Sequence, residues 1–188
     1  MKKTFFGFIV LIASLTINAN ETFSGFTMPE SVAEGRDGAI YVSEMGERDV
    51  DKDGKISKIN KEGVITTVAE GLYDPKGIVF FNDKLYVTDR DVVLEVSMNG
   101  SWIIYAGTMA FPKTPVFLND IDVSVNGDLY VTDTGDFESS GFVFLIKKTG
   151  DISVMFENNK NIKAPNGVLP ITSDKLLLVN WTGELLEA

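Results

Sequence analysis

The chain has 188 residues, of which 44% are hydrophobic and 23% are charged, the balance of a globular protein that can bury a core. It contains no cysteine and no histidine, which excludes disulfide bonds, thiolate or imidazole metal ligands, and catalytic triads built on histidine. The net charge of −10 argues against nucleic acid as a partner and favours cations or neutral small molecules.

The beginning of the chain has the pattern of a secretory signal peptide. Lys2 and Lys3 precede a short apolar run, and small and polar residues follow up to Asn20. A retained membrane anchor is the alternative, but the apolar run is short for a bilayer. We therefore expect residues 1–20 to be a signal peptide, the protein to be periplasmic or secreted, and no stable membrane anchor to remain after cleavage.

The next segment reads as four short strands, near residues 31–33, 39–44, 55–59 and 65–69. The turn before the third strand carries Asp49, Asp51 and Asp53, followed by Gly54. Carboxylates at alternate positions before a glycine are typical of the first half of a calcium-binding loop. Asn60 stands where an EF-hand has its last glutamate, so an EF-hand is not expected. A second, structural Ca²⁺ at this turn and a solvated acidic turn remain as the two interpretations.

This strand pattern recurs along the rest of the chain. One polar position recurs at intervals of 46, 43 and 47 residues, as Glu30, Lys76, Asn119 and Asn166. A second position follows it by 10 or 11 residues, as Tyr41, Tyr86, Tyr130 and Leu177. Repeats of this length with about four strands each are typical of β-propeller blades. A β-sandwich, the alternative, gives no reason for two positions that recur together.

The sequence therefore predicts an all-β fold, a β-propeller of four-stranded blades. The blades lie approximately at residues 26–72, 73–115, 116–163 and 164–188, the last one incomplete, within a partial propeller over residues 21–188. Because closed propellers have about four to eight blades, we expect either a fragment of a longer propeller or self-association through the open blade faces.

Two further sets of residues recur at the blade period. The second strand of each blade ends in a residue expected to accept hydrogen bonds within its blade, namely Glu44, Asp89, Asp133 and Asn180. The recurring tyrosines are expected to pack between sheets, and Trp181 is a candidate for the rim of the channel.

The recurring polar position is the candidate functional site. In a propeller the inner strands run along a shared channel, so Glu30, Asn119 and Asn166 should converge there. Oxygen ligands without imidazole or thiolate suit one hard divalent cation, Ca²⁺, Mg²⁺ or Mn²⁺. The same residues could instead cap backbone groups at the strand starts. Lys76 would disfavour a cation unless its side chain points away or meets Glu30.

Three motifs carry a family resemblance: Pro-Glu-Ser-Val at 29–32, Leu-Asn-Asp-Ile-Asp-Val at 118–123 and Ala-Pro-Asn-Gly-Val at 164–168. With them the chain resembles the senescence marker protein/gluconolactonase (regucalcin-like) family, and its Tyr-Val-Thr-Asp motifs resemble NHL-type repeats. The resemblance implies a six-bladed propeller, of which this chain would be a fragment. It also implies hydrolysis of sugar lactones with one divalent cation in the channel.

The resemblance implies roles for five residues. Glu30 and Asn166 would be metal ligands, whereas Asn119, Asp120 and Glu138 would contact the substrate. The family's third protein ligand, an aspartate that also serves as general base, lies in the blade after Asn166. The chain ends before that blade, so its catalytic residue is unknown and we expect the 188 residues alone to be inactive.

Two functions follow as candidates. The first is a secreted metal-dependent lactone hydrolase, in which the channel cation polarises the carbonyl of a small lactone or carbohydrate-like ligand and activates water. Phe117 stands where sugar-lactone members often carry an arginine, which sets this chain apart from them in sugar recognition. The second is a non-catalytic propeller that binds a protein, a peptide or a carbohydrate over its channel face.

Overall fold

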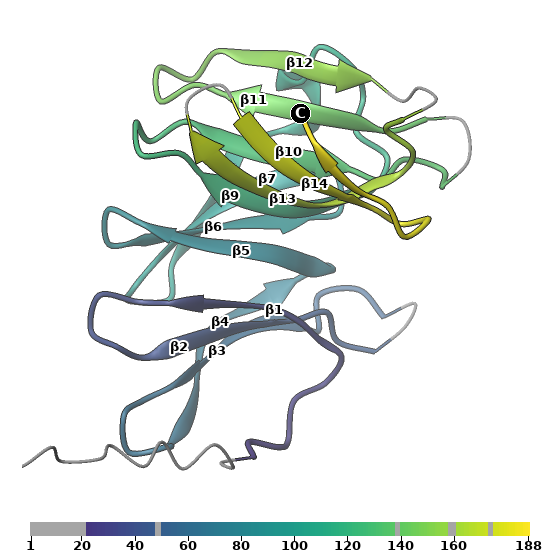
Figure 1. The fold of residues 1–188 in the computed structure, drawn as a ribbon. Coiled ribbons are helices and arrows are strands. Elements are labelled where there is room, and N and C mark those ends of the chain that lie inside the picture. The colour runs from purple at the N-terminus through teal and green to yellow at the C-terminus, as the bar shows by residue number, and fades with distance from the viewer. Residues whose placement is uncertain (1–21, 48–49, 138–139, 158–160, 173–174) are drawn as a thin grey trace, which may run out of the picture.

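A computed structural model describes residues 22–47, 50–137, 140–157, 161–172 and 175–188. Within these residues the chain forms 15 β-strands and one short 3-10 helix, η1 (Thr108–Ala110), which confirms the predicted all-β class (Figure 1). The predicted signal peptide lies outside the described residues. Among those described, no helix is long and apolar enough to cross a membrane.

The strands form four antiparallel sheets, each a meander of consecutive strands, here called blades 1 to 4. Blade 1 contains β1 (Pro29–Glu34), β2 (Ile40–Glu44), β3 (Gly54–Ile59) and β4 (Ile65–Leu72). Blade 2 contains β5 (Pro75–Phe81), β6 (Lys84–Asp89), β7 (Val92–Ser97) and β8 (Trp102–Ala106). Blade 3 contains β9 (Leu118–Val123), β10 (Leu129–Asp133), β11 (Phe142–Ile146) and β12 (Ile152–Glu157). Blade 4 contains β13 (Pro165–Thr172), β14 (Lys175–Asn180) and β15 (Leu185–Glu187).

Tight turns that require positive φ angles join several of these strands. Gly38 (φ 72°) lies between β1 and β2, and Gly127 (φ 85°) takes the matching place between β9 and β10. Glycine adopts this left-handed conformation without the steric cost that a Cβ atom would bring. The Asp37-Gly38 and Asn126-Gly127 pairs thus give blades 1 and 3 their first hairpins at matching positions, whereas in blade 2 Asn82 and Asp83 adopt the positive φ angles.

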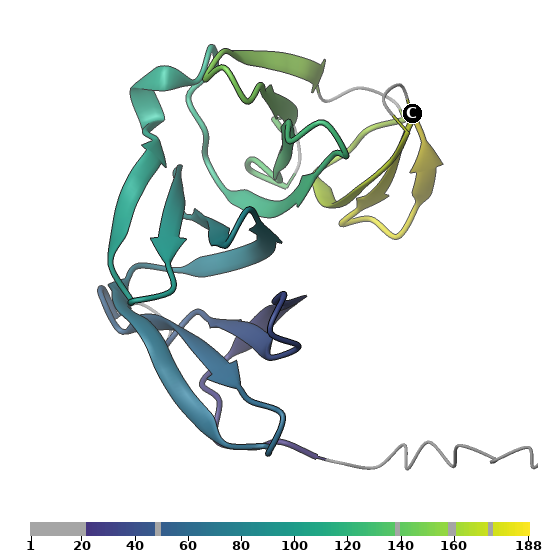
Figure 2. The ribbon, with the colours of Figure 1, turned by 90° about the vertical axis from the view of Figure 1, so that its left-hand side faces the viewer.

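The four blades follow one another around an arc, which is the arrangement of a partial propeller (Figure 2). Neighbouring blades meet through their first strands, so that β5 lies against β1, β9 against β5 and β13 against β9. This row of first strands lines the inner side of the arc. The predicted propeller is therefore confirmed, and it brings the starts of β1, β5, β9 and β13 to one end of a shared channel.

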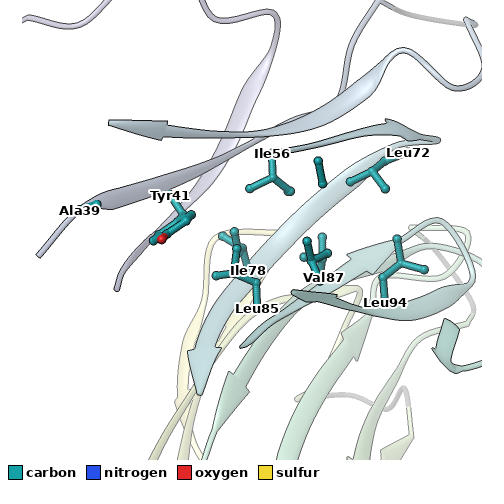
Figure 3. Packing of buried hydrophobic residues seen from close by; sticks show 10 residues of the cluster. Ala39, Tyr41, Ile56, Leu72, Ile78, Leu85, Val87 and Leu94 are labelled. Carbon is teal, nitrogen blue, oxygen red and sulfur yellow. The ribbon is translucent and has the colours of Figure 1, made fainter. Parts of the chain in front are cut away.

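Apolar side chains fill the space between successive blades. Between blades 1 and 2, Ile56 and Leu72 face Ile78, Val87 and Leu94, and all five are at most 5% exposed (Figure 3). Burying a side chain of this size contributes about 1.5–3 kcal/mol to folding. Similar clusters join blade 2 to blade 3 and blade 3 to blade 4. Packing between blades therefore fixes how the first strands sit around the channel.

The recurring tyrosines belong to these layers between the blades, as predicted. Tyr41 stacks on Phe80 of the next blade, with ring centroids 5.8 Å apart. Tyr130 is 3% exposed and belongs to the cluster that includes Val168 and Leu176 of blade 4. Tyr86 contacts Tyr105 of its own blade edge to face, at 5.0 Å.

Candidate functional site

Each first strand is irregular at its recurring polar position. Pairing of the first strand with the second shifts register there in all four blades, and the shifts include Glu30, Lys76, Asn119 and Asn166. Such β-bulges break the alternation of side chains between the two faces of a strand and redirect the residues they contain. The orientation of these four side chains is thus set locally in each blade.

One hydroxyl per blade ties each bulge to the next blade. Ser43, Thr88 and Thr132 occupy matching places on the second strands, and each donates a hydrogen bond to the backbone carbonyl of the next polar position. The oxygen–oxygen distances are 2.5, 2.6 and 2.6 Å, to the carbonyls of Lys76, Asn119 and Asn166. In blade 4 the matching residue is Val179, which has no hydroxyl.

The residues that end the second strands hold the segment entering each blade. Asp133 accepts hydrogen bonds from the backbone N–H groups of Val116 and Phe117 at 3.0 and 2.7 Å, and Asp89 accepts from Tyr73 and Asp74 in the same way. Glu44 accepts from Thr27 and Asn180 from Lys163. The prediction that these residues satisfy backbone groups within their own blades is confirmed.

Glu30 of blade 1 and Asp120 of blade 3 interact electrostatically across the channel. Burial among protein atoms, followed by the negative charge of Asp120, raises the pKa of Glu30 to about 7, while Lys76 acts in the opposite direction. By solvent accessibility, however, Glu30 is an exposed residue, so burial acts on only part of its side chain. The charge of Asp120 therefore reaches a carboxyl group that lies 90 positions earlier in the sequence.

Asp120 lies in the wall of the channel. It contributes, with Ser31, Glu34 and Asp122, to a groove of about 340 Å³ lined by first strands. Its two carboxylate oxygens accept hydrogen bonds from the backbone N–H groups of Val168 and Ile121, both at 2.9 Å. Burial raises the pKa of Asp120 to about 6, and these two hydrogen bonds oppose the shift.

Lys76 is only 4% exposed, and its ammonium group turns toward the segments at the channel mouth. Nζ donates to the backbone carbonyl of Asp74 at 3.2 Å and lies 4.2 Å from the centroid of the Phe117 ring. Burial lowers the pKa of Lys76, and the charge of Glu30 is among the effects that oppose this shift. The Lys76 nitrogen is therefore held by the Asp74 carbonyl and the Phe117 ring, but its charge still acts on Glu30 and lowers the pKa of that carboxyl.

Asn119 and Asn166 differ in their surroundings. Asn119 is 3% exposed; its Nδ2 donates to Thr134 Oγ1 at 3.0 Å, whereas its Oδ1 is buried without a hydrogen-bond partner. Asn166 is half-buried at the start of β13. The expectation that Asn119 faces a substrate stays a prediction, and the neighbouring Asp120 is the residue that lines the groove. Glu138 lies outside the described residues.

The acidic turn of blade 1 distributes its carboxylates among protein partners. Asp51 pairs with Arg90 of blade 2 at 2.5 Å, and one oxygen of Asp53 accepts from the backbone N–H of Glu47 at 2.6 Å. The other oxygen of Asp53 is buried without a hydrogen-bond partner. Asp49 lies outside the described residues. A structural calcium ion at this turn stays a prediction.

A row of aromatic side chains beside the channel mouth was not predicted from the sequence. The rings of Phe117 and Phe137 lie 5.3 Å apart between centroids, and those of Phe137 and Trp181 lie 5.1 Å apart. The three residues come from the segment before β9, the segment after β10 and the residue after β14. Trp181 was expected at the rim, but no periodic signal links the other two rings to it.

The oxygen donors at this end of the channel are carboxylates and amides, the ligand types that a hard cation prefers. The pKa values of Glu30 and Asp120 are raised, which means that nearby positive charge does not fully stabilise their ionised forms. The buried Oδ1 of Asn119 accepts no hydrogen bond. Among the described residues, no three acidic side chains gather closely enough to hold an ion by themselves. A cation here would therefore need amide oxygens in addition to carboxylates.

Comparisons with known proteins support the fold. No protein-family model matches the chain, and no curated protein matches it. Among solved structures, a gluconolactonase from Xanthomonas campestris has a TM-score of 0.70 at 15% identity, over 86% of this chain and 58% of that one. A calcium-binding protein, regucalcin from Agrobacterium tumefaciens, has a TM-score of 0.59 at 16% identity, over 80% of this chain and 52% of that one.

A propeller in a nidogen/laminin complex is also similar, with a TM-score of 0.66 at 21% identity, over 82% of this chain and 57% of that one. The chain thus spans little more than half the length of these neighbours. At such identities the likeness establishes a shared propeller fold.

Proposed function

We propose that the chain belongs to a secreted hydrolase that opens a cyclic ester with the help of one divalent cation bound at the channel end. The observation that carries the proposal is that the charge of Asp120, from blade 3, acts on Glu30, from blade 1, and that the pKa values of both carboxyls are raised. The likeness in fold to a gluconolactonase and to regucalcin supports the same reading.

The residues of this chain have distinct parts in the proposal. Glu30 and Asn166 would hold the cation, with oxygen ligands of the kind that Ca²⁺, Mg²⁺ and Mn²⁺ prefer. When bound, the cation would supply Lewis acidity toward a carbonyl oxygen and lower the pKa of a bound water. Asp120 and Asn119, on β9, would lie beside it and position the lactone ring. The carboxylate that removes a proton from water is expected in a further blade.

The property of this chain that tests the proposal is therefore lactone binding, not lactone hydrolysis. Saturation-transfer NMR of the purified chain with γ-butyrolactone should show lactone contacts that strengthen on addition of Ca²⁺ or Mn²⁺. Glu30→Gln should abolish the cation effect, because it removes one charged ligand without changing the size of the side chain. Glu62→Gln, at an exposed position in the turn between β3 and β4 and outside the groove, is the matched control. Saturation-transfer signals that change neither on addition of the cation nor in Glu30→Gln would refute the proposal.

A non-catalytic binding propeller is the second candidate, and the position of Lys76 favours it. An ammonium group close enough to lower the pKa of Glu30 partly supplies the positive charge that a cation would bring. In this case the channel face would bind a protein, a peptide or a carbohydrate, and the NMR experiment would show no cation effect. A periplasmic or extracellular location and self-association through the open blade faces are proposed with either function.

A further inference from the structure

Phe117, Phe137 and Trp181 form a continuous aromatic surface, here called the aromatic platform. Trp181 is 60% exposed and Phe137 is 38% exposed, whereas Phe117 is half-buried over the ammonium group of Lys76. The planes of Phe137 and Trp181 meet at 73°, edge to face. Edge-to-face pairing leaves ring faces free to accept another ring.

The backbone holds the platform beside the candidate cation site. The N–H of Phe117 donates to Asp133, and its carbonyl accepts from Thr134 at 2.9 Å. The N–H of Trp181 donates at 2.9 Å to the carbonyl of Ala164, two residues before Asn166. Phe117 itself lies two residues before Asn119. Both ends of the platform are therefore anchored within two residues of the recurring polar positions.

The backbone conformation of Phe137 is a second, independent observation. Its φ angle is +67°, in the left-handed region that bulky side chains rarely adopt. Such strain costs about 1–3 kcal/mol and is concentrated at ligand-binding and active sites. Here the strained residue is the central ring, which contacts both of the others. The backbone conformation of Phe137 thus accompanies the placement of its ring between Phe117 and Trp181.

The chemistry of the platform selects its ligand. The three rings offer apolar faces and only one hydrogen-bond donor, the indole N–H of Trp181, so the platform itself matches an aromatic ring better than the hydroxyl groups of a sugar. We propose that the aromatic platform binds an aromatic ring of the ligand, so that the substrate class is an aryl-substituted lactone and not a sugar lactone. The lactone part rests on the proposed function, but ring binding does not.

The test measures binding and not turnover. The variant Trp102→Phe leaves Trp181 as the only tryptophan, so its fluorescence reports on the platform. We expect α-phenyl-γ-butyrolactone to change this fluorescence saturably, and the cyclohexyl analogue and glucono-δ-lactone to bind more weakly. In this background Phe137→Leu should weaken binding of the phenyl lactone roughly 2- to 12-fold, the range of one aromatic contact. Phe137→Tyr, which keeps the ring, should retain affinity.

Met109→Ala is the matched control, because Met109 is 96% exposed and lies on η1, outside the platform. Equal affinity for the phenyl and cyclohexyl compounds, tighter binding of the sugar lactone, or no effect of Phe137→Leu would overturn the proposal. Running each titration with Ca²⁺ and with EDTA separates the two hypotheses. If the phenyl lactone binds more tightly than the cyclohexyl analogue but Ca²⁺ and EDTA have no effect, the proposed hydrolase is refuted and aromatic-ring binding by the platform is supported.

Discussion

Thr132 Oγ1 lies 2.6 Å from the backbone carbonyl oxygen of Asn166 and donates a hydrogen bond to it. The same hydroxyl accepts a hydrogen bond from the backbone N–H of Asp120 at 2.9 Å. One side chain on β10 therefore fixes the inner positions of blades 3 and 4 relative to each other. Ser43 joins Ser31 to Lys76 between blades 1 and 2 in the same manner.

Removing this hydroxyl should destabilise the chain. Thr132→Val keeps the shape of the side chain but leaves the N–H of Asp120 and the carbonyl of Asn166 without their partner. We expect the free energy of unfolding to fall by about 1–3 kcal/mol in urea titrations. Thr67→Val, at an exposed position on β4, should change it by less than about 0.5 kcal/mol. Equal losses in the two variants would contradict the assigned role of Thr132.

Gly77 should be intolerant of a side chain because β9 passes close to it. A Cβ atom at this position would lie 2.5 Å from the Cα of Asp120 and 2.7 Å from the N of Ile121. Gly77→Ala should therefore push β5 and β9 apart and lower the free energy of unfolding by about 1–3 kcal/mol or more. Gly107→Ala, where the nearest atom would be 3.6 Å away, should cost less. A stable Gly77→Ala variant would show that the blades are less closely packed than described.

Lys76 should weaken cation binding at the channel end. Lys76→Met removes the positive charge and keeps an apolar chain against Phe117, so we expect Ca²⁺ or Mn²⁺ affinity to rise roughly three- to tenfold in calorimetric titrations. Lys113→Met, at an exposed position outside the channel groove, controls for the change in net charge. Unchanged affinity in Lys76→Met would mean that the ammonium group is electrostatically irrelevant to the site.

The raised pKa of Asp120 predicts a pH dependence of stability. With a pKa of about 6 in the folded chain against an ordinary 3.8, the folded state binds this proton more tightly than the unfolded state. The stabilisation is complete below pH 3.8 and is lost as the pH rises through 6. Asp120→Asn should remove this contribution, so the wild type should lose at least about 1 kcal/mol more than the variant across this interval. Asp83→Asn, on the turn between β5 and β6, should leave the wild-type profile unchanged.

Much of the fold was predictable because the repeat that corresponds to one blade can be detected in the sequence. Turn residues, alternating strands and the residues that end each second strand recur in register, and packing between the blades follows from that register. The recurrence also placed Glu30, Lys76, Asn119 and Asn166 at one end of the channel. The repeat pattern alone was therefore enough to predict where these four residues occur in the chain.

The directions of the side chains were not predictable, for a local reason. Bulges at the starts of the first strands break the period-2 rule, so the sequence could not show that Asp120 lines the groove while Asn119 is buried. The pairing of Asp51 with Arg90 joins blades 1 and 2 across 39 residues and carries no repeat signal. The aromatic platform likewise depends on loop conformations, including the strained backbone at Phe137.

The most direct measurement of the central claim is a calorimetric titration of Ca²⁺ and of Mn²⁺ into the purified chain, beside Glu30→Gln and the control Glu62→Gln. We predict one saturable channel site in the wild type and in Glu62→Gln. Its affinity should fall at least about tenfold in Glu30→Gln, because a full charge leaves the ligand set. Identical isotherms for all three proteins, or no binding heat in any of them, would contradict a cation site formed by Glu30 at the inner ends of the blades.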